Sequence, residues 1–138
     1  MQRTTFARAH PLKGLVTYSG LAFAPNGNLY AASVATGRIG EFTLDGDLVR
    51  LVLDPGRWLP PYPTGTPQGV TVDADGTVYY ADLDLTTGLS PEPGPNGKVW
   101  RIRFANGEPL PPEIVLDGLA YPDGVAIGSG DGPKPTGN

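Results

Sequence analysis

Residues Gly20–Gly46, GLAFAPNGNLYAASVATGRIGEFTLDG, decide the fold of this 138-residue chain, because much of the stretch recurs downstream. The range 69–104 repeats it as GVTVDADGTVYYAD, an inserted loop and GKVWRIRF, and a third copy begins at Gly124 with GVAIG. The copies start 69 − 20 = 49 and 124 − 69 = 55 residues apart. Repeats with such a period are typical of arrays of small, similar structural units.

Each full copy predicts four short antiparallel strands joined by turns. In the first copy, Leu21 and Phe23 alternate with small residues, and further strands are expected at 29–33, 38–44 and 48–53. Asn26-Gly27 predicts a type I′ hairpin turn, because Asn and Gly accept positive φ angles, and Asp45-Gly46 predicts another tight turn. The second copy matches strand by strand, and no segment repeats its apolar residues with a helical period.

This pattern predicts an all-β fold made of β-propeller blades, each a four-stranded antiparallel sheet. The rival all-β interpretation is a sandwich, whose strands would not repeat in register along the chain. We expect the end of a preceding blade at 1–19, full blades at 20–66 and 67–121, and the start of a further blade with a tail at 122–138. Because a closed propeller needs about 4–8 blades, we expect an incomplete ring. It would be either a fragment of a larger propeller or a half-ring that pairs with a second copy.

Composition excludes several classes of function. The chain has 10 basic and 14 acidic residues, and the basic ones are scattered, so we expect no nucleic-acid partner. Only Arg101 and Arg103 lie close together on one face, where we expect them to pair with carboxylates. No apolar run is long enough for a membrane span, and we expect no membrane partner. With His10 as the sole His and no Cys, zinc or Ser–His chemistry is not expected. The N-terminus lacks a signal-peptide core, which makes a cytoplasmic location the default and an exported one the alternative if a leader lies upstream.

The motif P-x-G-hydrophobic-x-hydrophobic-D-x-x-G-x-hydrophobic-Y occurs at Pro67–Tyr79, with looser copies starting at Ser19 and Pro122. It resembles the NHL-repeat propellers and the related gluconolactonase (senescence marker protein) and strictosidine synthase-like group. The stretch TGRIGEFTLDG also looks like the repeat of streptogramin lyase propellers. The resemblance implies an NHL-like module that binds a small-molecule or protein ligand. The alternative that it implies is part of a metal-dependent, gluconolactonase-like hydrolase.

Unequal connections indicate where a ligand would bind. The turns after the first and third strands of each copy are short, whereas the connections at 54–67 and 82–96 are long, and loops of such length are often functional. We therefore expect the ligand face at the end of the sheets that carries the long connections. Candidate pocket residues there, which could equally pack the loops, are Arg57, Trp58, Tyr62 and Tyr121.

The candidate metal ligands rest on the resemblance to the gluconolactonase group. It implies that Asp123, in Pro122-Asp123-Gly124, binds a divalent cation such as Ca²⁺, and that Gln68 takes the place of a family Asn. One carboxylate and one amide are too few for Ca²⁺, which takes about 6–8 oxygens. The other interpretation of Asp123 is a turn cap before the strand.

Asp82 and Asp84 are the weak catalytic candidates. Because they lie two residues apart at the end of a strand, we expect them to point the same way, toward the ligand face. There they would help to bind a cation or act as a general base. The alternative is two solvated carboxylates at a strand end.

Overall fold

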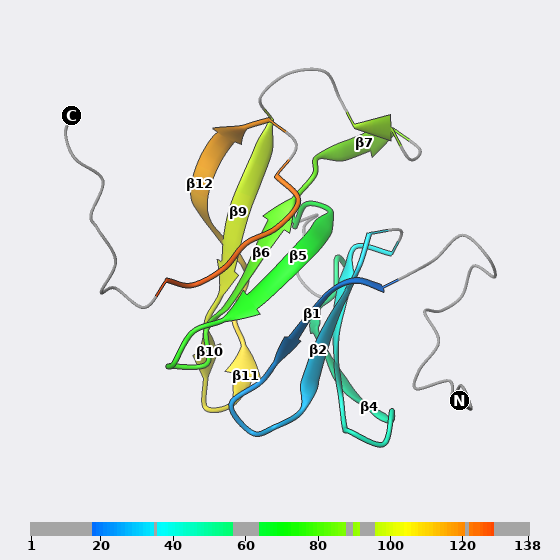
Figure 1. Ribbon diagram of the computed structural model, residues 1–138, viewed down its shortest axis with the longest axis vertical. Helices are drawn as coiled ribbons and strands as arrows, with labels where there is room; N and C mark the ends of the chain where they lie inside the picture. The colour runs from blue at the N-terminus through cyan, green and yellow to red at the C-terminus, as the bar shows by residue number, and fades with distance from the viewer. Residues whose placement is uncertain are drawn as a thin grey trace.

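The computed structural model describes residues 18–34, 36–56, 64–87, 90–91, 96–120 and 122–128. Within these ranges the chain contains no helix, and two four-stranded antiparallel sheets dominate it (Figure 1). The predicted all-β class and the predicted four-stranded units are therefore confirmed for the described part of the chain.

The first sheet follows the order of the chain. It consists of β1 (Tyr18–Phe23), β2 (Leu29–Ser33), β3 (Arg38–Phe42) and β4 (Leu48–Leu53). The second and fourth strands have the predicted bounds. The third ends two residues before the predicted Leu44, because the backbone N–H of Thr43 already donates to the carbonyl of Asp47 across the following turn.

The second sheet has the order β12-β9-β6-β5. Its strands are β5 (Pro67–Val72), β6 (Val78–Asp82), β9 (Gly97–Ile102) and β12 (Glu113–Leu119). Two small hairpins extend it. The pair β7 (Leu85–Thr87) and β8 (Ser90–Pro91) lies within the long connection, where the sequence predicted only a loop, and β10 (Phe104–Ala105) pairs with β11 (Glu108–Pro109).

The two sheets pair their strands in the same register. A row across the first sheet joins Ala22, Tyr30, Glu41 and Arg50. The row at the same position of the second sheet joins Thr71, Tyr79, Arg101 and Glu113. Residues at equal positions of the two sheets are called counterparts below; Leu21 and Val70, or Leu53 and Leu116, are examples.

The turn at Asn26-Gly27 differs from the predicted type I′ turn. Gly27 has a φ of 87° and donates to the carbonyl of Ala24, but Asn26 keeps a negative φ, so the loop is a type I turn closed by a left-handed Gly. Pro25 explains the difference, because its ring suits the first central position of a type I turn and it has no N–H for a two-residue hairpin. Asn106 and Gly107, with φ of 52° and 78°, do form the type I′ turn.

The core lies between the two sheets, and small residues let the backbones of β1 and β5 approach closely. The buried apolar side chains there are Ala24, Tyr30, Ala32, Ile39, Val52, Leu53, Val70, Val78, Tyr80, Trp100 and Ile102. A Cβ on Gly20 would collide with the backbone of Gln68 and lie 3.0 Å from the Cα of Gly69. Only glycine permits this approach, which explains why the repeat begins with Gly20.

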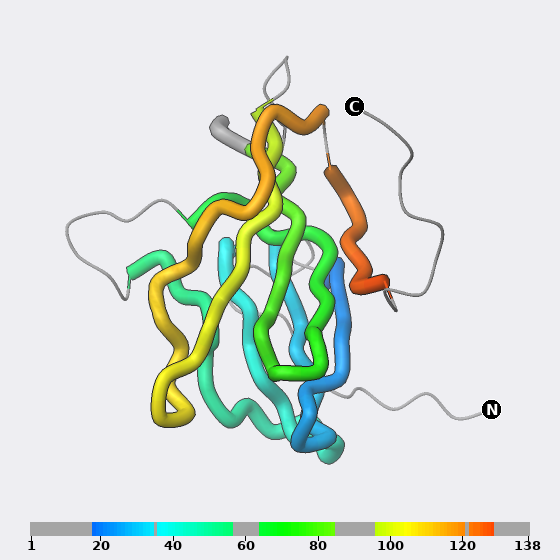
Figure 2. Tube along the Cα trace, turned by 90° about the vertical axis from the view of Figure 1, so that its left-hand side faces the viewer, coloured from blue at the N-terminus to red at the C-terminus, as the bar shows by residue number. Residues whose placement is uncertain are grey.

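The third copy of the repeat follows the same arrangement. A Cβ on Gly69 would lie 2.9 Å from the Cα of Gly124, so residues 122–128 pack on β5 much as β5 packs on β1. This segment pairs with no strand in the described residues, and Figure 2 shows it as a separate extended stretch. The predicted division into blades remains a prediction, although the three glycines stack in series.

The two ends of the sheets differ as predicted. The turns at 24–28, 43–47, 73–77 and 105–108 lie together at one end, the lower end in Figure 1. The connection that contains β7 and β8 lies at the opposite end, which is called the loop edge below. Any ligand site that depends on long loops would therefore form at the loop edge.

Candidate functional site

Asp82 is the best-defined polar group at the loop edge. It ends β6, is 1% exposed, and its carboxylate accepts three hydrogen bonds. Oδ1 accepts from the backbone N–H of Thr66 at 2.7 Å and from that of Asp84 at 2.8 Å, and Oδ2 accepts from the indole N–H of Trp100 at 3.0 Å. The prediction of a solvated carboxylate is therefore wrong for Asp82.

These three bonds tie together the ends of both long connections. Thr66 closes the connection that follows β4, and Asp84 opens the one that contains β7 and β8. Gly65, with a φ of 71°, passes so close to the Asp82 carboxylate that a side chain there would collide with it. Asp82 is consequently a residue that positions the loop edge.

Two aromatic side chains complete this anchor. The hydroxyl of Tyr80 donates to the carbonyl of Thr64 at 2.6 Å, and its ring stacks parallel to that of Trp100 with the centroids 6.3 Å apart. Both residues are buried in the core between the sheets. The stretch 64–66 is thus fixed to the second sheet by Tyr80 and Asp82 together.

Asp84 lies outside the strand that Asp82 ends. Its φ of 57° places it in the left-handed region, two residues after the end of β6. The alternation of side chains along a strand no longer applies there, and the shared direction of the two carboxylates stays a prediction. Asp84 is half-buried, and its assignment as a catalytic residue stays a prediction.

The structure brings the backbones of Gln68 and Asp123 to neighbouring positions. The carbonyl of Gln68 accepts a hydrogen bond from the Ser19 hydroxyl at 3.1 Å, and the carbonyl of Asp123 packs against Gly69. Asp123 is exposed. Among the described residues, no three Asp, Glu, His or Cys side chains gather as metal ligands would, and the assignment of Gln68 and Asp123 to a cation stays a prediction.

The remaining predicted site residues lie outside the described residues. These are Arg57, Trp58, Tyr62 and Tyr121. Their assignment to the ligand face stays a prediction.

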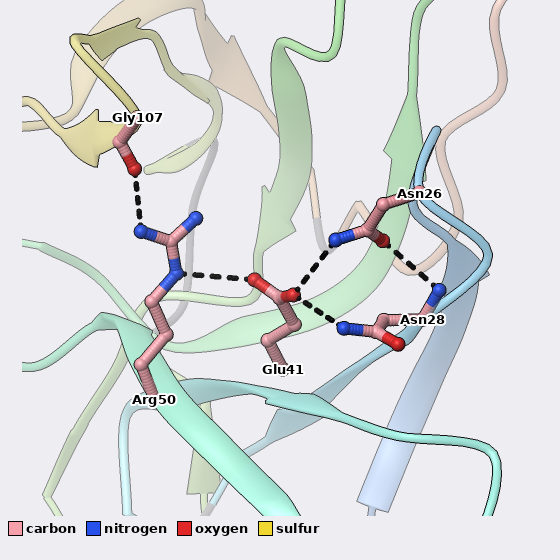
Figure 3. Close-up of polar contacts among 5 residues, drawn as sticks. All are labelled: Asn26, Asn28, Glu41, Arg50 and Gly107. Carbon is pink, nitrogen blue, oxygen red and sulfur yellow. Dashed lines mark hydrogen bonds and ion pairs between the residues drawn. The ribbon is translucent and has the colours of Figure 1, made fainter.

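A buried ionic network at the other end of the sheets escaped the sequence analysis. Glu41, 2% exposed on β3, accepts hydrogen bonds from the side-chain amides of Asn26 at 3.2 Å and Asn28 at 2.8 Å (Figure 3). Arg50 donates to its other oxygen at 3.1 Å. Arg50 then reaches the second sheet, where it donates to the carbonyl of Gly107 and lies over the Phe104 ring, 5.5 Å from its centroid.

The network keeps Glu41 charged. Burial raises the pKa of Glu41, but hydrogen bonds from Asn28, Asn26 and Arg50, with the charge of Arg50, outweigh burial and lower the pKa below 4.5. Burial, followed by the charge of Glu41, raises the pKa of the neighbouring Tyr30 above its usual value. The network therefore joins the two sheets through the ion pair of Glu41 and Arg50.

Sequence reasoning had one usable signal for this network. Apart from the exposed Arg38 at the start of β3, Glu41 is surrounded in its strand by apolar or small buried residues, and a charge among them requires a partner. The paired strands supply Arg50, which is visible only once the register of β3 and β4 is known.

The predicted pairing of Arg101 and Arg103 with carboxylates is confirmed. Glu113 accepts from Arg103 at 2.7 Å and from Arg101 at 3.4 Å. Arg101 and Glu113 are the counterparts of Glu41 and Arg50, so the same cross-strand pair recurs with its charges exchanged.

No helix in the described part of the chain is long and apolar enough to cross a membrane. Comparison of the sequence with protein-family models found no match, and comparison with curated proteins found none.

Solved structures do resemble the fold. One is the PQQ-bound aldose sugar dehydrogenase of Streptomyces coelicolor, with a TM-score of 0.53, 20% identity, and coverage of 78% of this chain and 32% of that chain. Another is a structure from Thermus thermophilus assigned as an oxidoreductase (glucose dehydrogenase), with a TM-score of 0.51 and 23% identity. The match covers 75% of this chain and 30% of that chain. This chain therefore spans about a third of the length of either chain.

These neighbours support a relationship to β-propellers, but they do not single out the NHL or gluconolactonase groups that the sequence resembles. At such low identity the likeness concerns the fold alone. The chain is an all-β protein with the fold of β-propeller blades.

Proposed function

We propose that this chain is an NHL-like β-propeller module that binds a small-molecule ligand at its loop edge. The observation that supports the proposal is the Asp82 anchor, in which one buried carboxylate holds both Thr66 and Asp84. Fixing the ends of two long connections before a ligand arrives lowers the entropy cost of binding. The connections at the opposite end, among the described residues, are tight turns.

The alternative function is that of a metal-dependent, gluconolactonase-like hydrolase. It would need a cation held by Asp123 and Gln68, and no group of three Asp, Glu, His or Cys side chains gathers in the described part of the chain. It would also need a free proton-transfer group, whereas the Asp82 carboxylate already accepts three hydrogen bonds. The binding module is therefore the better-supported proposal.

Amide chemical shifts of the isotope-labelled protein test where a ligand binds. The probes are PQQ and glucose, taken from the names of the structural neighbours, together with gluconolactone and CaCl₂. We expect a binding probe to shift amides at 64–66, 83–84 and 96–97, and to leave those at 43–47 and 73–77 unchanged. Shifts confined to the tight-turn end, or no shift with any probe, would contradict the proposal.

Calcium separates the two functions. If the hydrolase alternative is right, CaCl₂ raises the melting temperature and Asp123→Ala abolishes that increase. The binding module predicts no dependence of the calcium response on Asp123. Hydrolysis of gluconolactone by the wild type, lost in Asp123→Ala, would decide for the hydrolase.

A further inference from the structure

Each sheet has two different faces. The face of the first sheet that contacts the second carries Gly20, Ala32, Ile39 and Leu53, and it is called the covering face below. The face of the second sheet that it covers is called the receiving face, and its core residues are Val70, Tyr80, Trp100 and Ile102. By register, the first sheet has a receiving face of its own, which lies on the side away from the second sheet.

The receiving face of the first sheet is apolar, and it is open along its outer strands β1 and β4, whereas Ala31 and Phe42 on its inner strands are buried. Leu21 is 60% exposed, whereas its counterpart Val70 is 7% exposed beneath the first sheet. Phe23 is 68% exposed, and Leu48, in the same row, is also exposed. An exposed apolar face of this kind marks an interaction surface.

The covering face of the second sheet is likewise open along its outer strand β12, whereas Ala81 and Val99 on its inner strands are buried. Leu116 is 55% exposed, whereas its counterpart Leu53 is fully buried against the second sheet. In register, this face corresponds to the covering face of the first sheet, which packs on the receiving face of the second sheet. The chain thus carries one closed interface and the two halves of another, of which the covering half is partly occupied by residues 122–128.

We propose that the receiving face of the first sheet binds the covering face of the second sheet in another copy of this chain. The interface within the chain is the template, because counterpart residues would meet in the same register. The charged row of the second sheet is compatible with this contact, since Glu113 already pairs with Arg101 and Arg103. The proposal concerns a partner surface and is independent of the ligand at the loop edge.

Residues 122–128 must leave their place for this contact to form. They pack on Gly69, where β1 of the incoming copy would lie, just as β5 packs on Gly20. Only Pro122 and Val125 are partly buried, and the other five residues of the segment are exposed. A complete four-stranded sheet buries far more apolar surface than this segment, so the exchange favours association.

Such a contact joins two different surfaces and is heterologous. Copies joined in this way form a ring or an open chain, in contrast to a two-fold dimer in which one patch meets itself. Each copy therefore needs both of its faces for growth beyond two chains.

The test uses one variant per face and measures molar mass by light scattering over a dilution series. Phe23→Asp places a charge on the receiving face, and Leu116→Asp places one on the covering face; both positions are exposed, so the fold tolerates them. Leu21→Asp replaces Phe23→Asp if the latter melts early. Ala74→Asp, in an exposed turn, is the control of equal charge.

The expected result has three parts. The wild type and Ala74→Asp increase in mass with concentration, and each face variant stays a single chain. An equal mixture of Phe23→Asp and Leu116→Asp forms two-chain particles and nothing larger, because only one intact pair of faces remains. A wild type that stays a single chain at every concentration overturns the proposal. So does self-association of Leu116→Asp, since this would show the receiving face meeting itself.

Discussion

Replacing Asp82 tests whether one carboxylate organises the loop edge. Asp82→Ala removes the acceptor of three N–H groups at once. A buried donor left without an acceptor costs about 1–3 kcal/mol. Trp100 is buried, so water cannot replace its lost partner, whereas Thr66 and Asp84 are half-buried and water replaces part of theirs. Asp82→Ala is therefore expected to lower the free energy of unfolding by about 3–4 kcal/mol.

Asp82→Asn separates the two oxygens of the carboxylate. The amide oxygen still accepts from Thr66 and Asp84, but its NH₂ group then faces the indole N–H of Trp100. The indole N–H is then left without an acceptor, and the free energy of unfolding is expected to fall by about 2 kcal/mol. At roughly 3–4 °C per kcal/mol for a chain of this size, the melting temperature should fall by about 10 °C for Ala and about 6 °C for Asn.

Thermal melting and amide hydrogen exchange form the assay, with Asp84→Asn as the matched control. Asn tolerates the positive φ at position 84, so this control should melt within about 2 °C of the wild type. In Asp82→Ala, the amides of Thr66 and Asp84 should exchange faster while that of Tyr80, within β6, stays protected. If Asp82→Ala melts like the control, or if the two loop amides stay protected, the reasoning is refuted.

Three further changes test the contacts between and beside the sheets. Glu41→Gln should lower the free energy of unfolding by about 1–2 kcal/mol near pH 7. Because the pKa of Glu41 in the folded protein lies below 4.5, this loss is complete above pH 4.5 and becomes smaller as the pH falls through the folded pKa. Urea unfolding at several pH values measures it. Gly20→Ala should cost about 3 kcal/mol in the same assay, because its Cβ meets only backbone atoms, whereas Gly124→Ala, whose Cβ meets nothing within 4 Å, should be neutral. Tyr80→Phe should cost about 1 kcal/mol and speed proteolysis near Thr64, and equal proteolysis would contradict the role given to its hydroxyl.

The architecture was predictable because the signals for it are local. Alternation in short runs and Gly-containing turns located eight main strands, and the spacing of Gly20, Gly69 and Gly124 identified the repeated unit. The type of the first turn was not predicted, since Pro25 outweighs the preference of Asn26-Gly27. The β7–β8 hairpin was missed because its strands are three and two residues long and carry no periodic pattern.

The site was harder to predict because its contacts join distant parts of the chain. Asp82 was identified as an acid at the loop edge, but its partners Thr66 and Trp100 lie 16 and 18 residues away, and no local pattern marks them. For the same reason Glu41 was not recognised as the centre of a network with Asn26, Asn28 and Arg50. Burial decides the role of both acids, and burial depends on the packing of two sheets.

The exchanged charges of the two sheets show what the repeat preserves. In the first sheet the acid Glu41 is on the third strand, and the turn before β2 supplies the amide donors Asn26 and Asn28. In the second sheet the base Arg101 takes that position and pairs with Glu113, whereas Asp73 in the corresponding turn accepts hydrogen bonds from the backbone of Asp75 and Thr77. The pattern therefore preserves an ion pair between the third and fourth strands, and the individual residues vary. Arg50 crosses to Gly107 and Phe104, whereas Glu113, which takes its place in the second sheet, is paired with Arg101 and Arg103, so the two covering faces differ in the charges that they carry. Such a difference specifies the order in which sheets stack, since a sheet suited to Arg50 would meet a carboxylate at the other face.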